Sequence, residues 1–176
     1  LFKTDLMCHF EFPEDIRFED MLLTYEILTK AKSIGTVREQ LYYYRRNASG
    51  SFLNTFSEAT FDMLKVFDRL VRYYQAYDIF NYYKEELECI FIRSTYKRYE
   101  TIVSNCDVSQ LDLKIKMVRL TSQFMDAYFP DWRNNRYEKY SMDKDLIKFS
   151  PEFKDTEGFI QGIQQSVDEN KRLLTI

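Results

Sequence analysis

The chain has 176 residues, 45% hydrophobic and 30% charged, a balance typical of a globular domain with a hydrophobic core. Its net charge of −3 argues against nucleic acid as the main partner, because phosphate binding requires an excess of basic side chains. Aromatic residues make up 17% of the chain and only 4 Gly and 3 Pro are present, so we expect long helices rather than a loop-rich sandwich.

Residues 1–54 are expected to form a short α/β segment. A helix is predicted to begin at Glu19 and Asp20, because negative charge is favoured at a helix N-terminus. Two short strands are predicted after it, at residues 33–37 and 41–44. An extended piece, a helix and two strands fit the edge of an α/β domain better than a free-standing fold. The apolar face predicted for the helix recurs at spacings of three, at Leu22, Tyr25, Leu28 and Ala31.

Residues 55–130 predict three helices joined by short links, packed as antiparallel neighbours. The run 55–58 is a capping box for the first helix, and Asp78 is expected to cap the second. Residues 107–110 open the third helix, which Pro130 ends. Each helix has a predicted inward stripe. The stripes contain Phe56, Met63, Phe67, Leu70 and Tyr74, then Ile79, Tyr83, Leu87, Ile90 and Phe91, and finally Leu113, Met117, Leu120 and Phe124.

Residues 131–176 are expected to be a polar linker followed by an amphipathic helix that begins near Ser150 and Pro151. The fold predicted for the whole chain is therefore mainly α, with a short α/β remnant over about residues 1–50 and an antiparallel helical bundle after it. The apolar face of the terminal helix contains Phe159, Ile160, Ile163 and Val167.

The three cysteines, Cys8, Cys89 and Cys106, are widely spaced and odd in number, which favours a reducing, cytoplasmic compartment over a disulfide framework. His9, the only histidine, lies next to Cys8. A zinc site would require a second His or a CxxC pair, so we interpret Cys8 and His9 as packing residues and expect no metal site in this chain. The sequence has no apolar run long enough to cross a bilayer.

Several short motifs follow one another in a fixed order along the first 55 residues. This ordered series resembles the second half of the family 2 (GT-A type) glycosyltransferases that build bacterial exopolysaccharides and capsules. The resemblance is close over these residues and extends to the helical remainder only in general character. The motifs are LFKTDL at 1–6, FPE at 12–14, FED at 18–20, KAK at 30–32, LYYYRR at 41–46 and SGS at 49–51.

The resemblance implies that Asp20 is the general base, which takes the proton from the acceptor hydroxyl as that hydroxyl attacks the anomeric carbon with inversion. Glu19 and Tyr44 would hold the acceptor. Arg45 and Arg46 would stabilise the charge on the departing nucleoside diphosphate. By pattern alone, the five carboxylates Glu11, Glu14, Asp15, Glu19 and Asp20 belong to a solvated loop and the helix start that follows it. The run 41–46 is, on the same reading, a buried aromatic strand with one arginine in solvent.

The partners that the resemblance implies are a nucleotide-sugar donor and a glycan acceptor, with peripheral association at the inner face of the membrane. The parent enzyme is expected to hold Mg²⁺ or Mn²⁺ at a DxD motif in a preceding nucleotide-binding half. The letters Asp143-Lys144-Asp145 follow no predicted strand, and we interpret that match as chance. We therefore expect no cofactor in this chain, and we expect it to be part of a longer enzyme that does not transfer sugar alone. The alternative function is a non-catalytic helical module that forms homodimers through the bundle.

Overall fold

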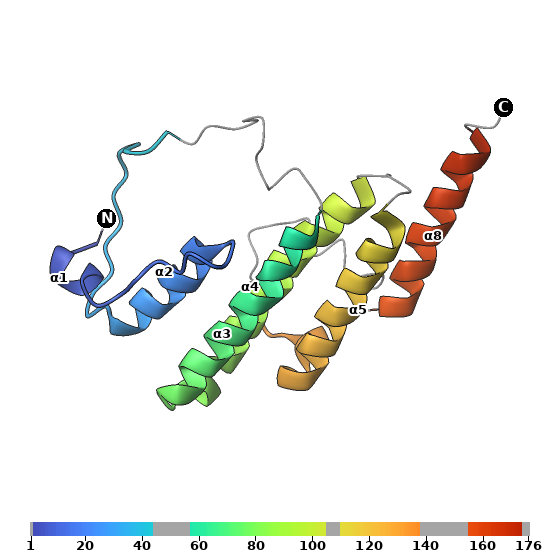
Figure 1. Cartoon of the computed structure of the whole chain (residues 1–176). Coiled ribbons are helices and arrows are strands. Elements are labelled where there is room, and N and C mark those ends of the chain that lie inside the picture. Colours follow the sequence, from blue (N-terminus) through green and yellow to red (C-terminus); the bar gives the residue numbers. More distant parts are fainter. Residues whose placement is uncertain (1, 44–56, 105–109, 138–154, 174–176) are drawn as a thin grey trace.

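The computed structural model describes residues 2–43, 57–104, 110–137 and 155–173 (Figure 1). These ranges are mainly helical, which confirms the mainly α fold, and none of them contains a strand. The elements are α1 (Thr4–Met7), α2 (Glu19–Lys30), the 3-10 helix η2 (Glu58–Phe61), α3 (Asp62–Ala76), α4 (Phe80–Ser104), α5 (Leu111–Tyr128), the 3-10 helix η4 (Trp132–Asn134) and α8 (Thr156–Leu173).

The two strands predicted after α2 are not formed within the described residues. Residues 33–43 run away from α2 as an extended trace (Figure 1) and have no strand assignment. Their apolar side chains are exposed, for example 73% for Ile34 and 97% for Tyr43. A strand requires a neighbour to complete its hydrogen-bond ladder, and the described part of the chain offers no second strand.

Helix α2 begins at Glu19, as the acidic pair predicts. Its buried face, however, is formed by Leu22, Leu23 and Ile27, whereas Leu28 is 37% exposed. The expected face at a strict spacing of three was therefore confirmed at Leu22 and at Tyr25, which is half-buried against the core, and was wrong at Leu28. An α-helix repeats every 3.6 residues, so a three-residue spacing drifts off the face that contacts the core.

The junction between α3 and α4 also differs from the prediction. Asp78 does not cap α4, which begins at Phe80; it has a left-handed backbone (φ 56°) just after α3. The N–H of Ile79 donates to the Tyr74 carbonyl at 2.9 Å, and that of Asp78 donates to the Gln75 carbonyl at 3.0 Å. These two bonds form a Schellman motif, so Asp78 ends α3.

The start of the first long helix lies slightly later than expected. Thr55 is outside the described residues, and η2 begins after Ser57, whose backbone N–H donates to Thr60 Oγ1 at 3.2 Å. This bond satisfies one of the amides that a helix N-terminus leaves without a partner.

Aromatic side chains fill the core between α3, α4 and α5, which lie side by side in Figure 1. Phe67 of α3 is fully buried and stacks on Phe91 of α4, with ring centroids 4.0 Å apart. Phe124 of α5 lies 5.9 Å from Phe67, and Phe129 packs edge-on against Phe91 at 5.5 Å. Such ring pairs contribute about 0.5–1.5 kcal/mol each beyond the area they bury. Many of the chain's abundant aromatic side chains thus pack against one another in the core.

A short segment after α5 is fastened to the neighbouring helices by buried polar groups. Trp132 is 4% exposed, and its Nε1–H donates to Asp126 at 2.8 Å. Asn135 Nδ2 donates to the Glu88 carboxylate at 2.6 Å and to the Glu85 carbonyl at 3.0 Å. Burial raises the pKa of Glu88, and the hydrogen bond from Asn135 opposes that shift. The segment therefore closes one end of the core with satisfied polar groups.

Helix α8 packs on α5 through the face that the sequence predicts, with Ile160, Ile163 and Val167 buried. The residues expected to start this helix, Ser150 and Pro151, lie outside the described residues. No helix in the described ranges is both long and apolar enough to cross a bilayer.

Phe67→Ala is expected to lower the free energy of unfolding by about 3–5 kcal/mol, because it opens a cavity against a stacked ring that cannot collapse to fill it. Urea denaturation followed by circular dichroism measures this loss. The matched control is Phe12→Ala, at a side chain that is 55% exposed, for which we expect a change within about 0.5 kcal/mol. Equal losses in the two variants would contradict the assigned core.

Candidate functional site

Asp20 is the second residue of α2, and its side chain is exposed. Its Oδ1 accepts the backbone N–H of Met21 at 2.8 Å, which leaves Oδ2 at the surface. Glu19 precedes it in the same first turn and is half-buried. The N-terminal end of a helix dipole favours the charged form of a carboxylate. The arrangement presents an accessible carboxylate oxygen, which is what a general base requires.

Phe18, the residue before this acidic pair, has an unusual backbone. Its φ of 63° and ψ of 30° are left-handed. For a bulky residue that conformation costs about 1–2 kcal/mol, and it persists only where the surroundings enforce it. The Phe18 carbonyl accepts the N–H groups of Met21 at 3.1 Å and Leu22 at 3.4 Å. The first turn of α2, with Asp20 in it, is therefore built directly on a strained residue.

Three consecutive residues before Phe18 contact the core or α3. Asp15 accepts two hydrogen bonds from the Arg69 guanidinium, at 2.6 and 3.3 Å. Ile16 is 6% exposed and belongs to the core cluster. The backbone N–H of Arg17 donates to Asp62 Oδ2 at 3.2 Å. The hydrogen bond from Arg69 lowers the pKa of Asp15, which remains ionised at neutral pH. We call Asp15, Ile16 and Arg17, together with Asp62 and Arg69, the α3 clamp.

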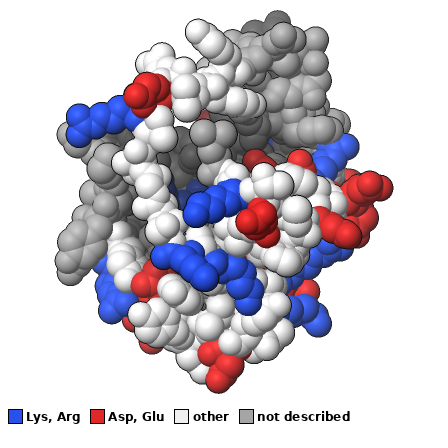
Figure 2. All heavy atoms as spheres, turned by 90° about the vertical axis from the view of Figure 1, so that its left-hand side faces the viewer, with Lys and Arg blue, Asp and Glu red and all other residues white. Residues whose placement is uncertain are grey.

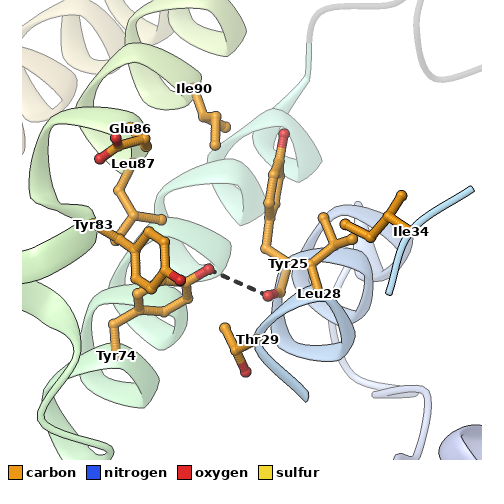
Figure 3. Close-up of a pocket in the computed structure, with 9 residues that line it drawn as sticks. All are labelled: Tyr25, Leu28, Thr29, Ile34, Tyr74, Tyr83, Glu86, Leu87 and Ile90. Atoms are coloured by element: carbon orange, nitrogen blue, oxygen red, sulfur yellow. Dashed lines mark hydrogen bonds between the residues drawn. The ribbon is translucent and has the colours of Figure 1, made fainter. Parts of the chain in front are cut away.

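The middle of α2 is held to α3 by tyrosine hydroxyls. Tyr74 donates to the Tyr25 carbonyl at 3.2 Å (dashed in Figure 3), and Tyr73 lies 3.1 Å from Thr29 Oγ1. Burial raises the pKa of Tyr74 to about 12, with smaller contributions from neighbouring tyrosines. At the C-terminal end, the Lys30 ammonium lies 3.6 Å from the centroid of the Tyr77 ring. Helix α2 is thus fixed to α3 from its middle to its C-terminal end.

A cavity of about 260 Å³ lies between α2, α3 and α4 (Figure 3). Its walls are mainly apolar, and the Tyr74 hydroxyl is already used in the bond to Tyr25. The Glu86 carboxylate is turned away from the centre of the cavity (Figure 3), and its Oε1 accepts the Tyr137 hydroxyl at 2.5 Å. The other Glu86 oxygen, Oε2, is buried without a hydrogen-bond partner. The residues that line it are Tyr25, Leu28, Thr29, Ile34, Tyr74, Tyr83, Glu86, Leu87 and Ile90.

The face on the side of α1 and α2 has basic and acidic side chains interspersed over its described surface (Figure 2). Such a mixture gives no extended region of purely positive or purely negative electrostatic potential on the described part of this face. Within the described ranges, no three His, Cys, Asp or Glu side chains are grouped closely enough to hold a metal ion. Cys8 and His9 are exposed, so their interpretation as packing residues was wrong.

The other predicted site residues, Tyr44, Arg45 and Arg46, lie outside the described residues, as do Asp143 and Asp145. Of the predicted set, the structure therefore describes only Glu19 and Asp20, which are adjacent in the sequence.

Sequence reasoning missed the α3 clamp, because its partners are far apart along the chain: 54 residues for Asp15 and Arg69, and 45 for Arg17 and Asp62. The same separation hid the cavity, whose walls come from three helices and the segment after α2. A positive φ at Phe18 likewise has no signature in sequence, since bulky residues are seldom left-handed.

No family model matches the chain, and comparison with curated proteins and with solved structures gave no match.

The free energy of unfolding is expected to fall as the pH rises from about 10 towards 12. An unfolded tyrosine loses its proton near pH 10, whereas folded Tyr74 retains it to about pH 12. The folded state then holds more protons, so stability decreases with pH, by about 1–2 kcal/mol for this group. Denaturation at several pH values measures the slope. Tyr74→Phe should show a shallower decline, and Tyr82→Phe, at an exposed position, should match the wild type. A Tyr74→Phe slope equal to that of the wild type would contradict the assignment.

Proposed function

We propose that this chain is the acceptor-side, C-terminal part of an inverting family 2 glycosyltransferase, which transfers a sugar from a nucleotide-sugar to a glycan acceptor in surface polysaccharide biosynthesis. Residues 1–54 would be the C-terminal segment of its GT-A domain, and residues 55–130 its helical bundle extension. The observation that carries the proposal is the exposed Asp20 carboxylate at the start of α2, within the ordered series of motifs in the first 55 residues.

In the proposed reaction, Asp20 accepts the proton of an acceptor hydroxyl while that oxygen attacks the anomeric carbon from the face opposite the diphosphate. The bond from the anomeric carbon to the diphosphate oxygen breaks, and its electrons leave with the nucleoside diphosphate. Glu19 and Tyr44 would orient the acceptor, and Arg45 and Arg46 would stabilise the leaving diphosphate by charge-assisted hydrogen bonds. The Mg²⁺ or Mn²⁺ ion expected in the parent enzyme would be held by its nucleotide-binding half.

The two members of the acidic pair have different proposed roles because their surroundings differ. Asp20 is exposed, whereas Glu19 is half-buried at the first position of the helix. Only the more accessible group is suited to approach a hydroxyl delivered from solvent. Glu19 is therefore proposed to support the acceptor rather than to transfer the proton.

A second candidate is a helical module that forms homodimers. It draws on Tyr77, Tyr82 and Tyr83, which are exposed near the α3–α4 junction at 52%, 79% and 38%. Aromatic residues of this kind are enriched in the centres of interfaces. A concentration-dependent mass in multi-angle light scattering, lost on Tyr82→Ser, would support it; a constant monomer mass would exclude it.

Asp20→Asn in the full-length protein that carries this chain is expected to lower kcat by about 10²–10⁴-fold, because an amide cannot accept the proton in the transition state. Release of nucleoside diphosphate from a panel of nucleotide-sugars, with glycolipid extract as acceptor, measures turnover. Donor binding, measured by calorimetry, should be unchanged. Glu19→Gln is the adjacent, isosteric control and should retain more activity than Asp20→Asn. Wild-type turnover in Asp20→Asn would sink the assignment of the base.

A further inference from the structure

The α3 clamp, which the sequence did not predict, fixes the chain immediately before the acidic pair. We propose that Asp62 and Arg69 of α3 are positioning residues for Asp20: they hold residues 15–17 so that Phe18 adopts its left-handed backbone and Asp20 is presented at a fixed place. This inference rests on the proposed function for the role of Asp20, and it gives the helical extension a part in the reaction.

The central contact is the hydrogen bond from the Arg17 N–H to Asp62. The Asp62 side chain is only 14% exposed, and its other oxygen lies 2.7 Å from the Lys65 ammonium. Both oxygens are thus engaged, and a shielded carboxylate–amide bond is stronger than one between neutral groups. Because it grips the backbone of Arg17, this bond fixes the chain itself one residue before Phe18.

The flanking contacts prevent the chain from turning about that bond. Ile16 anchors its side chain in the core on one side of the backbone, and Asp15 forms its two-bond pair with Arg69. The side chains of Asp15 and Arg69 are 69% and 40% exposed, so their ion pair adds little to the free energy of unfolding. Its main contribution is to fix the direction of the chain at Asp15. A chain held at three successive residues has little freedom left at the fourth.

The clamp and the tyrosine contacts act on different parts of α2. The hydroxyls of Tyr73 and Tyr74 reach the middle of the helix, whereas the clamp reaches only the residues before it. Loss of the clamp should therefore leave α2 docked, with Leu22 still in the core, and loosen the backbone of its first turn. A misplacement of about 1 Å in a catalytic group can cost about 10²-fold in rate. The expected signature is a lower kcat with little change in KM.

Hydrogen exchange tests the structural half of the inference on the chain itself. In Asp62→Ala, the amides of Met21 and Leu22, which bond to the Phe18 carbonyl, should exchange at least about 10-fold faster, while Ile27 is unchanged, because only the first turn opens. Asp62→Asn retains an oxygen acceptor and should restore slow exchange. The matched control is Asp68→Ala, which removes an α3 carboxylate paired with Arg72 and Tyr128 instead.

Unchanged exchange at Met21 and Leu22 in Asp62→Ala would overturn the inference. So would an equal acceleration along all of α2, which would show that the clamp merely docks the helix. The flanking pair is tested by exchanging its charges: Asp15→Arg and Arg69→Asp should each speed exchange, and the double variant should restore it. A double variant no slower than the singles would remove the pair from the clamp.

Turnover in the full-length protein separates failure of this inference from failure of the proposed function. Asp62→Ala should lower kcat about 10–100-fold with little change in KM, and Asp68→Ala should leave both unchanged. If Asp20→Asn abolishes turnover but Asp62→Ala leaves kcat intact, the positioning role is wrong and the function stands. If Asp20→Asn turns over normally, the proposed function fails, and with it the role of the clamp in catalysis.

Discussion

Helix α3 holds the described structure together, because it is buried against α2 on one side and against α4 on another. Helix α3 contacts α2 through Tyr73 and Tyr74, and it contacts α4 through the stack of Phe67 on Phe91. Met63, Val66, Phe67, Leu70, Val71 and Tyr74 are all buried on this helix, which leaves only a narrow strip for solvent. Ile16 and Leu22 of the N-terminal segment belong to the core cluster that includes α3, so the shape of this segment depends on α3.

This dependence gives a physical reason for the strained residue at Phe18. A left-handed bulky residue is unfavourable alone, and contacts on either side of it must supply the compensation. The α3 clamp lies before it, and the packing of Leu22, Leu23 and Ile27 lies after it. These two sets of contacts together fix the backbone conformation at Phe18. The acidic pair follows Phe18 directly, at the start of α2, where the helix dipole favours an ionised carboxylate.

The parts of the fold that the sequence predicted are those set by local chemistry and helical periodicity. The stripe Met63, Phe67, Leu70 and Tyr74 is buried, and the acidic pair does begin α2. The failures arose where a partner distant in sequence decides the outcome. Segment 33–43 contains strand-favouring residues such as Ile34, Val37 and Tyr42, but β structure depends on a pairing partner.

The candidate site was likewise predictable only where local sequence decides the outcome. Asp20 could be singled out from a motif, because its role would follow from residue type and order. Arg69 and Asp62 could not, because on a helix surface they look like ordinary solvated charges. The face of α2 was predicted only in part for a related reason: Leu23 and Ile27 are buried although they lie outside the core cluster, which the periodicity of α2 alone does not reveal.

A base at Asp20 that deprotonates the acceptor implies a single displacement, in which the configuration of the anomeric carbon is inverted. Proton NMR of the glycan formed by the full-length protein from an α-linked nucleotide-sugar measures that configuration directly through the coupling of the anomeric proton. We expect a β-linked product. An α-linked product would contradict it, because retention requires either a second displacement or attack from the face that the diphosphate leaves.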